Sequence, residues 1–484
     1  MSFTLRSIAV STVPMRTRMP FRYGIDKLEA LPHVFVKVEL ESAPDGRVTE
    51  GVCAEGLLPK WFEKNPETTG QQDLENMHKV IVHAGELALA AGPFDSAFRF
   101  WKDLYDAQAA WATGEGLAPL IWHFGVTMVE RAVIDALCRY WHVPFQTALA
   151  ENRFGIEVAS IHPHISQATA QEVLERRPLD SIHVRHTVGL SDAILPDEVE
   201  EPLNDGLPES MLDDIRAYGL TYYKIKVRGD VDVDVARLRR IAEVFRSLGV
   251  EGYRFTLDGN ETFYDVDTFR TFWDRIRGDA ALSAFFKRLI FIEQPFTRKI
   301  ALSHELGRDL KSWQDAPPMI IDESDGSLED VPTALSHGYS GTSHKNCKGV
   351  FKGIINAVYI HDANKRAGKD RYFMSGEDLV NIGPVALLQD LTLMGVLNIA
   401  HVERNGHHYF RGLSMFSDGL QEEMLKHHGD LYHRHPDGYA ALNIVKGRVD
   451  IHSLMRAPFG VAFIPHESAY VPIAEWPCPT GPEA

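Results

Sequence analysis

The run YYKIKV at residues 222–227 is a short, mostly apolar strand candidate that carries two lysines, and the chain repeats this kind of run at intervals. Stretches with helical spacing lie between the runs, such as VDVARLRRIAEVFRSLG at residues 233–249. The eight strand candidates are IHVRHTV (182–188), YYKIKV (222–227), YRFTLD (253–258), LIFIE (289–293), MIID (319–322), TSHKN (342–346), YFMSG (372–376) and LNIAHVE (397–403). This alternation predicts an α/β fold, a closed (β/α) barrel of the TIM type. A doubly wound open sheet is the weaker alternative, because no GxGxxG loop follows the first strand.

The residues before the barrel have a different pattern. VFVKVEL at residues 34–40 alternates apolar and polar residues, a Pro-Asp-Gly turn follows, and residues 48–53 resume an extended pattern, which predicts a hairpin. Apolar residues then recur at helical spacing between Asp73 and His142. We therefore expect an α+β capping domain at residues 1–155, completed by the tail 411–484, and a barrel at residues 156–410.

Segments that fit neither pattern are expected to be additions to this plan. The Pro-, Asp- and Glu-rich stretch 196–210 is predicted to be a solvated insertion between the first barrel strand and its helix. Residues 60–73 and 156–180 are further additions, and the tail, with its strand-like stretch 438–452, is expected to pack on the first domain.

Composition and charge exclude several classes of function. The chain of 484 residues has a formal net charge of −17, which disfavours a nucleic-acid partner, because such binding relies on Lys and Arg at phosphates. No run of about 18 apolar residues occurs, so no membrane span is expected. The four cysteines show no metal-ligand spacing and are predicted to be free thiols. We expect a cytoplasmic protein, a homo-oligomer, whose partner is a small molecule.

Ionisable residues stand at or near the ends of five successive strand candidates: Lys226, Asp258, Glu293, Asp322 and Lys345. In a parallel barrel the C-terminal ends of the strands form one mouth, where active sites lie, so these side chains are expected to meet. Asp258, Glu293 and Asp322 supply only oxygen ligands, which suit Mg²⁺, with Mn²⁺ as a possible substitute. Without a cation, three buried carboxylates would repel one another and raise one another's pKa.

Lys224 and Lys226 are separated by one residue, so on a strand both point to the same face, the barrel mouth. Repulsion between the two ammonium groups, together with a nearby cation, is expected to lower a lysine pKa from about 10.4 toward 7–8, where a lysine can act as a base. Lys226 would then be the base, and Lys224 would hold a substrate carboxylate.

The motifs YKIKV, LDGN, FIEQP, IDES and HKNCKG occur here in the order and type of the muconate-lactonizing-enzyme branch of the enolase superfamily. The chain resembles that mandelate racemase/muconate lactonizing enzyme family over most of its length, including MRTRMPFRYG as a capping loop. The resemblance implies a modified (β/α)7β-like barrel with a capping domain. It also implies that Asp258, Glu293 and Asp322 bind Mg²⁺ and that Asn260 and Gln294 lie close behind them.

By the same resemblance, Lys226 and Lys345 are bases on opposite faces of the substrate. Two choices stay open, because Lys348 rivals Lys345 in the unusual sequence NCKGVFKG, and strand alternation permits only one of Asp322 and Glu323 to face inward.

Further side chains are candidates for substrate binding. Glu377 and Glu403 end the seventh and eighth strand candidates, where a hydroxyl or amine of the substrate could meet them. Arg18, with Arg16 and Arg22, lies in the capping loop and could take a second anionic group of the substrate.

The expected activity is Mg²⁺-dependent removal of the α-proton of a carboxylate substrate through an enediolate, giving racemisation, epimerisation or cycloisomerisation. A dehydratase of acid sugars on the same site is one alternative, and a metal-binding barrel without turnover is the other.

Overall fold

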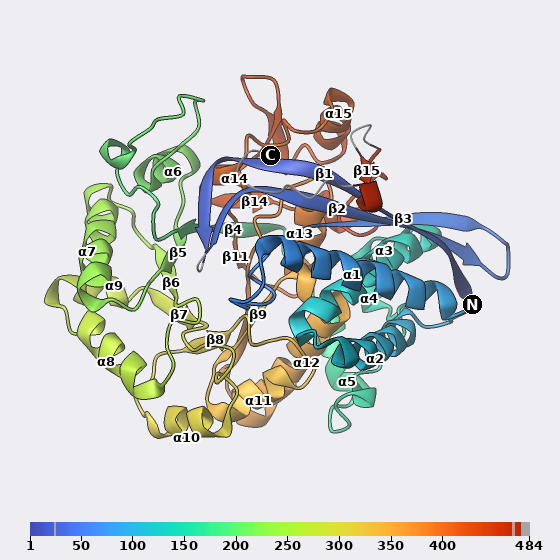
Figure 1. The fold of residues 1–484 in the computed structure, drawn as a ribbon, viewed down its shortest axis with the longest axis horizontal. Coiled ribbons are helices and arrows are strands. Elements are labelled where there is room, and N and C mark those ends of the chain that lie inside the picture. Colours follow the sequence, from blue (N-terminus) through green and yellow to red (C-terminus); the bar gives the residue numbers. More distant parts are fainter. Residues whose placement is uncertain (24–25, 467–469, 476–484) are drawn as a thin grey trace.

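A computed structural model describes residues 1–23, 26–466 and 470–475 of the chain. Its N-terminal part is an antiparallel sheet in the order β15-β1-β2-β3. The strands are β1 (Phe3–Tyr23), β2 (Asp26–Ser42), β3 (Val48–Gly56) and β15 (Val471–Pro472). β1 and β2 form a long ribbon that extends from the helices of this domain across to the barrel (Figure 1), where β1 contacts α14. The predicted hairpin is confirmed as β2 and β3, whereas the capping loop proves to belong to a strand, β1.

Three helices pack beside this sheet: α1 (Gly70–Ala90), α2 (Ala97–Glu115) and α3 (Pro119–Trp141). α3 is buried on nearly all sides from Leu120 to Cys138, because it contacts α1, α2 and β3 of the cap as well as the loop after barrel strand β9. A helix in such a central place is mostly apolar, and the charged residues that α3 buries, Glu130, Arg131 and Asp135, all have partners. The helical spacing seen between Asp73 and His142 is therefore confirmed.

The barrel is closed and parallel, as predicted. Its strands are β4 (Ser181–Val188), β5 (Tyr222–Lys226), β6 (Arg254–Asp258), β7 (Leu289–Glu293), β8 (Met319–Ile321), β9 (Gly341–His344), β10 (Phe373–Gly376) and β11 (His401–Glu403). They follow one another around the sheet in sequence order, and β11 pairs with β4 to close it. Each of the eight strand candidates overlaps one of these strands.

Helices alternate with the barrel strands and form the outer layer (Figure 1). They are α6 (Met211–Tyr218), α7 (Val231–Ser247), α8 (Val266–Arg277), α9 (Ser283–Phe286), α10 (His304–Ser312), α11 (Asp330–His337), α12 (Val350–Ala367) and α13 (Ala386–Val396). Directly after β11 comes the short α14 (Gly406–Tyr409) in place of a full barrel helix, which agrees with the expected (β/α)7β-like barrel.

The connecting and terminal segments correct part of the sequence interpretation. They hold α4 (Phe145–Ala150), α5 (Gln167–Leu174), α15 (Asp418–His427), β12 (Tyr432–Arg434), β13 (Ala440–Leu442) and β14 (Arg448–Asp450). The tail does reach the first domain, because β15 pairs with β1. The strand-like stretch 438–452 does not, because β14 pairs antiparallel with barrel strand β4 and so extends the barrel sheet. The first residues of β4 (181–183) precede the register that β4 shares with β5, so their backbone offered hydrogen bonds that the local sequence could not reveal.

Two smaller expectations concern membranes and thiols. No described helix is long and apolar enough to cross a membrane. Cys53, Cys138 and Cys347 are buried free thiols, as predicted, whereas Cys478 lies outside the described residues.

Candidate active site

Residues at the ends of six barrel strands and residues of the cap line one cavity at the C-terminal ends of the strands. The barrel contributes Lys224, Lys226, Asp258, Asn260, Asp322, Glu323, Lys345, Asp378, Leu379, Val380 and Glu403. The cap contributes Phe21, Leu58, Lys60, Trp61 and Lys64. The expectation that the strand-end side chains meet at one mouth is thus met by four of the five predicted residues, and Glu293 lies directly behind them, paired with Lys224.

The Lys224 ammonium group is the centre of this mouth. Its Nζ lies 2.8 Å from Glu293 Oε1 and 3.0 Å from Asp258 Oδ2. It also lies 3.1 Å from Glu377 Oε2 and 3.1 Å from Glu403 Oε2. Lys224 is 2% exposed, so these ion pairs are shielded from water and their geometry is held firmly.

The predicted lowering of a lysine pKa is wrong for Lys224. Burial lowers the pKa of Lys224, but the four carboxylates outweigh it and hold the pKa well above its usual value. Lys345 behaves similarly. Burial lowers its pKa, but Asp322 outweighs burial and raises the pKa above its usual value. The neighbouring ammonium groups are therefore not the dominant charges, because carboxylates lie closer to each of them.

Lys226 is held by two residues of the next strand end. Its Nζ donates to Asp258 Oδ2 at 2.6 Å and to Asn260 Oδ1 at 2.5 Å. The backbone N–H of Asn260 in turn donates to Asp258 Oδ1 at 2.8 Å. Asn260 therefore fixes both the lysine and the carboxylate.

On the other side of the mouth, two lysines contact Asp322. Lys345 Nζ lies 2.6 Å from Asp322 Oδ2, and it lies over the Trp61 ring at 4.1 Å from the ring centroid. Lys348 Nζ lies 2.8 Å from Asp322 Oδ1 and also donates to the oxygens of Ser343. Lys345 lines the cavity, whereas Lys348 is not among its lining residues.

Strand alternation does not choose between Asp322 and Glu323, because β8 ends at Ile321 and both residues follow the strand. Both line the cavity, which corrects the expectation that only one could face inward. The turn after β9 also has its own form: a 3₁₀ turn at Asn346–Lys348 and then Gly349, whose φ of 91° favours glycine, before α12.

The three predicted metal ligands fit a cation in their chemistry. Burial raises the pKa of Glu293 well above its usual value, and Asp258 and Glu377 raise it further, as expected of crowded carboxylates. Glu293 Oε2 is buried and has no hydrogen-bond partner. At Asp258 and Asp322 the expected rise is wrong: against burial, the adjacent lysines lower both pKa values. An unpaired carboxylate oxygen beside further carboxylates is the donor set that a hard cation such as Mg²⁺ takes.

The three carboxylates are not, however, gathered as one tight cluster. Lys224 lies between Asp258 and Glu293, and Asp322 is paired with Lys345. Among the residues that the structure describes, His186, Asp214 and His407 form the group of three whose ligand atoms all lie within 4.8 Å of one another.

Gln294 positions the loop that carries Asp322. Its side-chain Oε1 accepts hydrogen bonds from the backbone N–H of Asp322 at 2.7 Å and of Ser324 at 3.2 Å. Its Nε2 donates to Phe296 O and to Ser324 Oγ, both at 2.7 Å. Gln294 is 1% exposed, so its amide supplies the hydrogen bonds that water would otherwise make to this buried loop.

Glu377 and Glu403, the candidates for substrate contact, are both buried in ion pairs. Glu377 pairs with Arg185 and Lys224 and does not line the cavity. Glu403 lines the cavity, and its Oε1 accepts a hydrogen bond from Thr187 at 2.5 Å. Of the two, Glu403 is the one that a substrate could reach.

Arg18 is placed away from the cavity, which corrects its expected role. Its guanidinium binds Asp205 of the 196–210 segment through two hydrogen bonds of 2.7 and 2.6 Å. Its Nη1 donates to the carbonyl oxygens of Pro208 and His408. Asp205, in the acidic run 196–210, thus takes the place at Arg18 that was expected for an anionic group of the substrate. Arg16 is exposed, and the side chain of Arg22 lies outside the described residues.

Cap residues in the cavity wall were missed by the sequence interpretation. Leu58, Trp61 and Lys64 follow β3, and the last two lie in the segment 60–73 that was expected only to be an addition. Lys64 Nζ donates to Asn260 O at 3.0 Å and pairs with Glu261 at 2.7 Å, so this segment is tied to the barrel. The run LPKWFEK at residues 58–64 was a usable signal, because it places aromatic residues between two lysines in a loop, and loops often carry binding residues.

No family model matches the chain, and no curated protein matches it either. Many solved structures do match the chain. A mandelate racemase/muconate lactonizing protein from Herpetosiphon aurantiacus is 18% identical, with 94% of this chain and 98% of that chain covered and a TM-score of 0.58. An enolase from Bradyrhizobium, complexed with magnesium and mandelic acid, is 14% identical, with 93% and 94% covered and a TM-score of 0.55.

A dipeptide epimerase from Enterococcus faecalis V583, complexed with Mg and the dipeptide L-Leu-L-Tyr, is 14% identical. It covers 83% of this chain and 89% of its own length, with a TM-score of 0.53. The closed barrel, the antiparallel cap and these likenesses agree with the resemblance seen in the sequence motifs. The protein therefore has the fold of the mandelate racemase/muconate lactonizing enzyme family of the enolase superfamily.

Proposed function

We propose that the protein is a Mg²⁺-dependent isomerase that removes and returns the proton on the carbon next to a substrate carboxylate. The observation that carries this proposal is the placement of two lysines in one cavity. Lys226 is the last residue of strand β5 and Lys345 comes directly after strand β9, and both line the cavity together with Asp258 and Asp322.

A proton can be exchanged at each of these two lysines once the charge of bound Mg²⁺ offsets that of Asp322, the carboxylate that raises the pKa of Lys345. Lys226 Nζ donates to Asn260 and Asp258, so its position is set by the strand beside it. Lys345 Nζ is set by Asp322 and by the face of Trp61. With two such groups, one lysine can accept the α-proton from the substrate while the other donates a proton to the carbon, which inverts its configuration.

Asp258, Glu293 and Asp322 would hold Mg²⁺, which when bound supplies positive charge that stabilises the charge developing on the substrate carboxylate. Glu293 contributes a buried oxygen without a partner. Gln294 keeps Asp322 in place through its backbone N–H. The magnesium complexes of the Bradyrhizobium enolase and the dipeptide epimerase support this choice of ion.

The substrate class follows from the wall of the cavity. The cap and the loop after β10 present Phe21, Leu58, Trp61, Leu379 and Val380. An apolar group at the distal end of the substrate would bury surface against these side chains. We therefore propose a carboxylic acid with an apolar substituent, and this replaces the second anionic group that Arg18 had suggested.

Proton exchange in D₂O tests the proposal. Purified protein with Mg²⁺ is incubated with single enantiomers of aryl 2-hydroxy acids, N-acylated apolar amino acids, dipeptides and sugar acids, and NMR follows deuterium at the α-carbon. We expect deuterium in the product of an apolar acid, loss of activity on chelation and its return with Mg²⁺ or Mn²⁺. Release of water from a sugar acid would instead indicate the dehydratase, and no exchange with any acid would indicate a barrel without turnover.

Lysine variants then separate the two bases. Lys226→Ala and Lys345→Ala are each expected to stop isomerisation, while each still permits exchange from one enantiomer, a different one in the two variants. Lys287→Ala, a change at an exposed lysine outside the cavity, is the matched control. Exchange from both enantiomers in Lys345→Ala would refute the two-base arrangement, and the same selective loss in Lys348→Ala would move the second base to Lys348.

A further inference from the structure

A group of buried histidines and one aspartate lies beside the barrel mouth and takes no part in the proposed reaction. His186 lies on β4, Asp214 on α6 and His407 on α14, with exposed fractions of 2%, 0% and 8%. The neighbour of His186, Thr187, donates to Glu403 at the mouth. Because side chains alternate along a strand, His186 points the other way, toward α6.

The distances within this group suit a shared metal ion. His186 Nδ1 lies 3.2 Å from His407 Nε2, and the other ring nitrogen of His186, Nε2, lies 3.6 Å from Asp214 Oδ2, so only one of these two contacts belongs to a shared ligand set. With one ligand atom taken from each residue, the three atoms all lie within 4.8 Å of one another. Two ligands at about 2.0–2.1 Å from a tetrahedral Zn²⁺ stand about 3.4 Å apart, so the three side chains would close in from separations of up to 4.8 Å to bind one ion.

Some polar atoms of this group have no hydrogen-bond partner within the protein. Oδ1 of Asp214 and Nδ1 of His407 are buried and have no hydrogen-bond partner, whereas Oδ2 of Asp214 faces Nδ1 of His408 at 2.9 Å. Buried polar atoms without partners are rare, because each loses its water without compensation.

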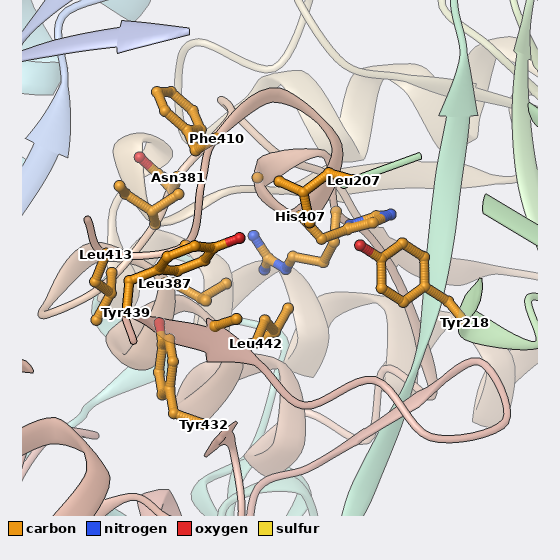
Figure 2. Close-up of a pocket in the computed structure, with 15 residues that line it drawn as sticks. Leu207, Tyr218, Asn381, Leu387, His407, Phe410, Leu413, Tyr432, Tyr439 and Leu442 are labelled. Atoms are coloured by element: carbon orange, nitrogen blue, oxygen red, sulfur yellow. The ribbon is translucent and has the colours of Figure 1, made fainter. Parts of the chain in front are cut away.

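The surroundings provide an outer partner and a neighbouring cavity. His408 Nδ1 lies 2.9 Å from Asp214 Oδ2, an arrangement that orients a ligating carboxylate. His407 also lines a small, largely apolar cavity with Tyr218, and Figure 2 shows the two side chains next to each other in its wall. The ring centroids of Tyr218 and His407 are 5.0 Å apart, so the tyrosine packs against the imidazole edge-on.

We propose that His186, Asp214 and His407 form a second metal site, for Zn²⁺ or a similar transition-metal ion. Two imidazoles and one carboxylate are a donor set that such ions prefer over Mg²⁺. The ion would join β4, α6 and α14. It would thereby fix the 196–210 segment, which leads into α6, next to the point where Arg18 of the cap donates to His408 O.

Cobalt titration tests the site, because tetrahedral Co²⁺ has visible absorption bands and replaces Zn²⁺ at such sites. Full-length protein, stripped of metals and supplied with excess Mg²⁺ for the barrel carboxylates, is titrated with Co²⁺. We expect one Co²⁺ per chain with these bands in the wild type and in Glu293→Gln, whose barrel site is weakened. The bands should be lost in His407→Gln and in the nearly isosteric Asp214→Asn.

His162→Gln is the matched control, because His162 has the same exposed fraction of 8% as His407 and lies outside both sites. It should bind Co²⁺ like the wild type. Zn²⁺ should also raise the Tm of the wild type and of His162→Gln. Absence of both the Co²⁺ bands and the Zn²⁺ effect in the wild type would overturn the proposal, as would unchanged bands in His407→Gln and Asp214→Asn.

Discussion

Replacing Gln294 by leucine should weaken the proposed magnesium site from behind, without removing any ligand. The substitution leaves the N–H groups of Asp322 and Ser324 without the acceptor that lies at 2.7 and 3.2 Å in the wild type. Each buried donor left unpaired costs about 1–3 kcal/mol, so the free energy of unfolding should fall by about 2–6 kcal/mol. The loop with Asp322 should also move.

The effect on metal binding is the more specific readout. Loss of a side chain that orients a ligand costs about 10–100-fold in metal affinity. We expect calorimetric titration with Mg²⁺ to show a Kd raised by that factor in Gln294→Leu, and urea unfolding to show the loss of stability.

Gln108→Leu is the matched control. Gln108 lies in α2, far from the barrel mouth, and is 0% exposed. Its side-chain Nε2 donates to Val80 O at 3.0 Å. It should lose stability and keep the Mg²⁺ affinity of the wild type. Unchanged Mg²⁺ affinity in Gln294→Leu would refute the argument that this amide supports a metal ligand.

Three further changes probe other parts of the molecule. Glu293→Gln should weaken Mg²⁺ binding, because it removes the charge next to the unpaired oxygen, and an affinity equal to the wild type in calorimetry would contradict the assignment. Burial raises the pKa of Glu130 to about 8 against an unfolded value of 4.5, so the folded state holds a proton more tightly and stability falls as the pH rises from about 5 to 8. Glu130→Gln should flatten this part of the Tm profile against pH, and an unchanged profile would count against it. Arg18→Ala should release Asp205 and speed proteolysis within residues 196–210 without changing Mg²⁺ affinity; equal cleavage rates would show that Arg18 does not anchor this segment.

Most of the barrel could be predicted because its signals are local. A run such as LIFIE is apolar and β-branched, lies between helical stretches and ends in a carboxylate, and β7 has the same bounds, Leu289–Glu293. The long strand β1 was missed because MRTRMPF does not alternate in a regular way. Its extended form comes from pairing with β2 along nearly its whole length, which is a long-range contact.

The candidate site, too, could be predicted only in part. The lysines and carboxylates at the strand ends were evident from spacing, since the topology of a parallel barrel carries them to one mouth. Their electrostatics were not, because the pKa of a buried lysine depends on the sum of all nearby charges. The sequence showed Lys224 next to Lys226, whereas the fold surrounds Lys224 with carboxylates from four other strands.

The sequence by itself determined the order of strands and helices and the chemical types at the barrel mouth, because periodicity and strand ends are properties of neighbouring residues. Only the tertiary structure decided that Lys345 rather than Lys348 lines the cavity, that Arg18 turns to Asp205, and that His186 and Asp214 approach His407. These choices depend on which side chains from distant segments come within a few ångströms of each other. Coulomb energies and hydrogen bonds act over that short range, and no local pattern specifies it.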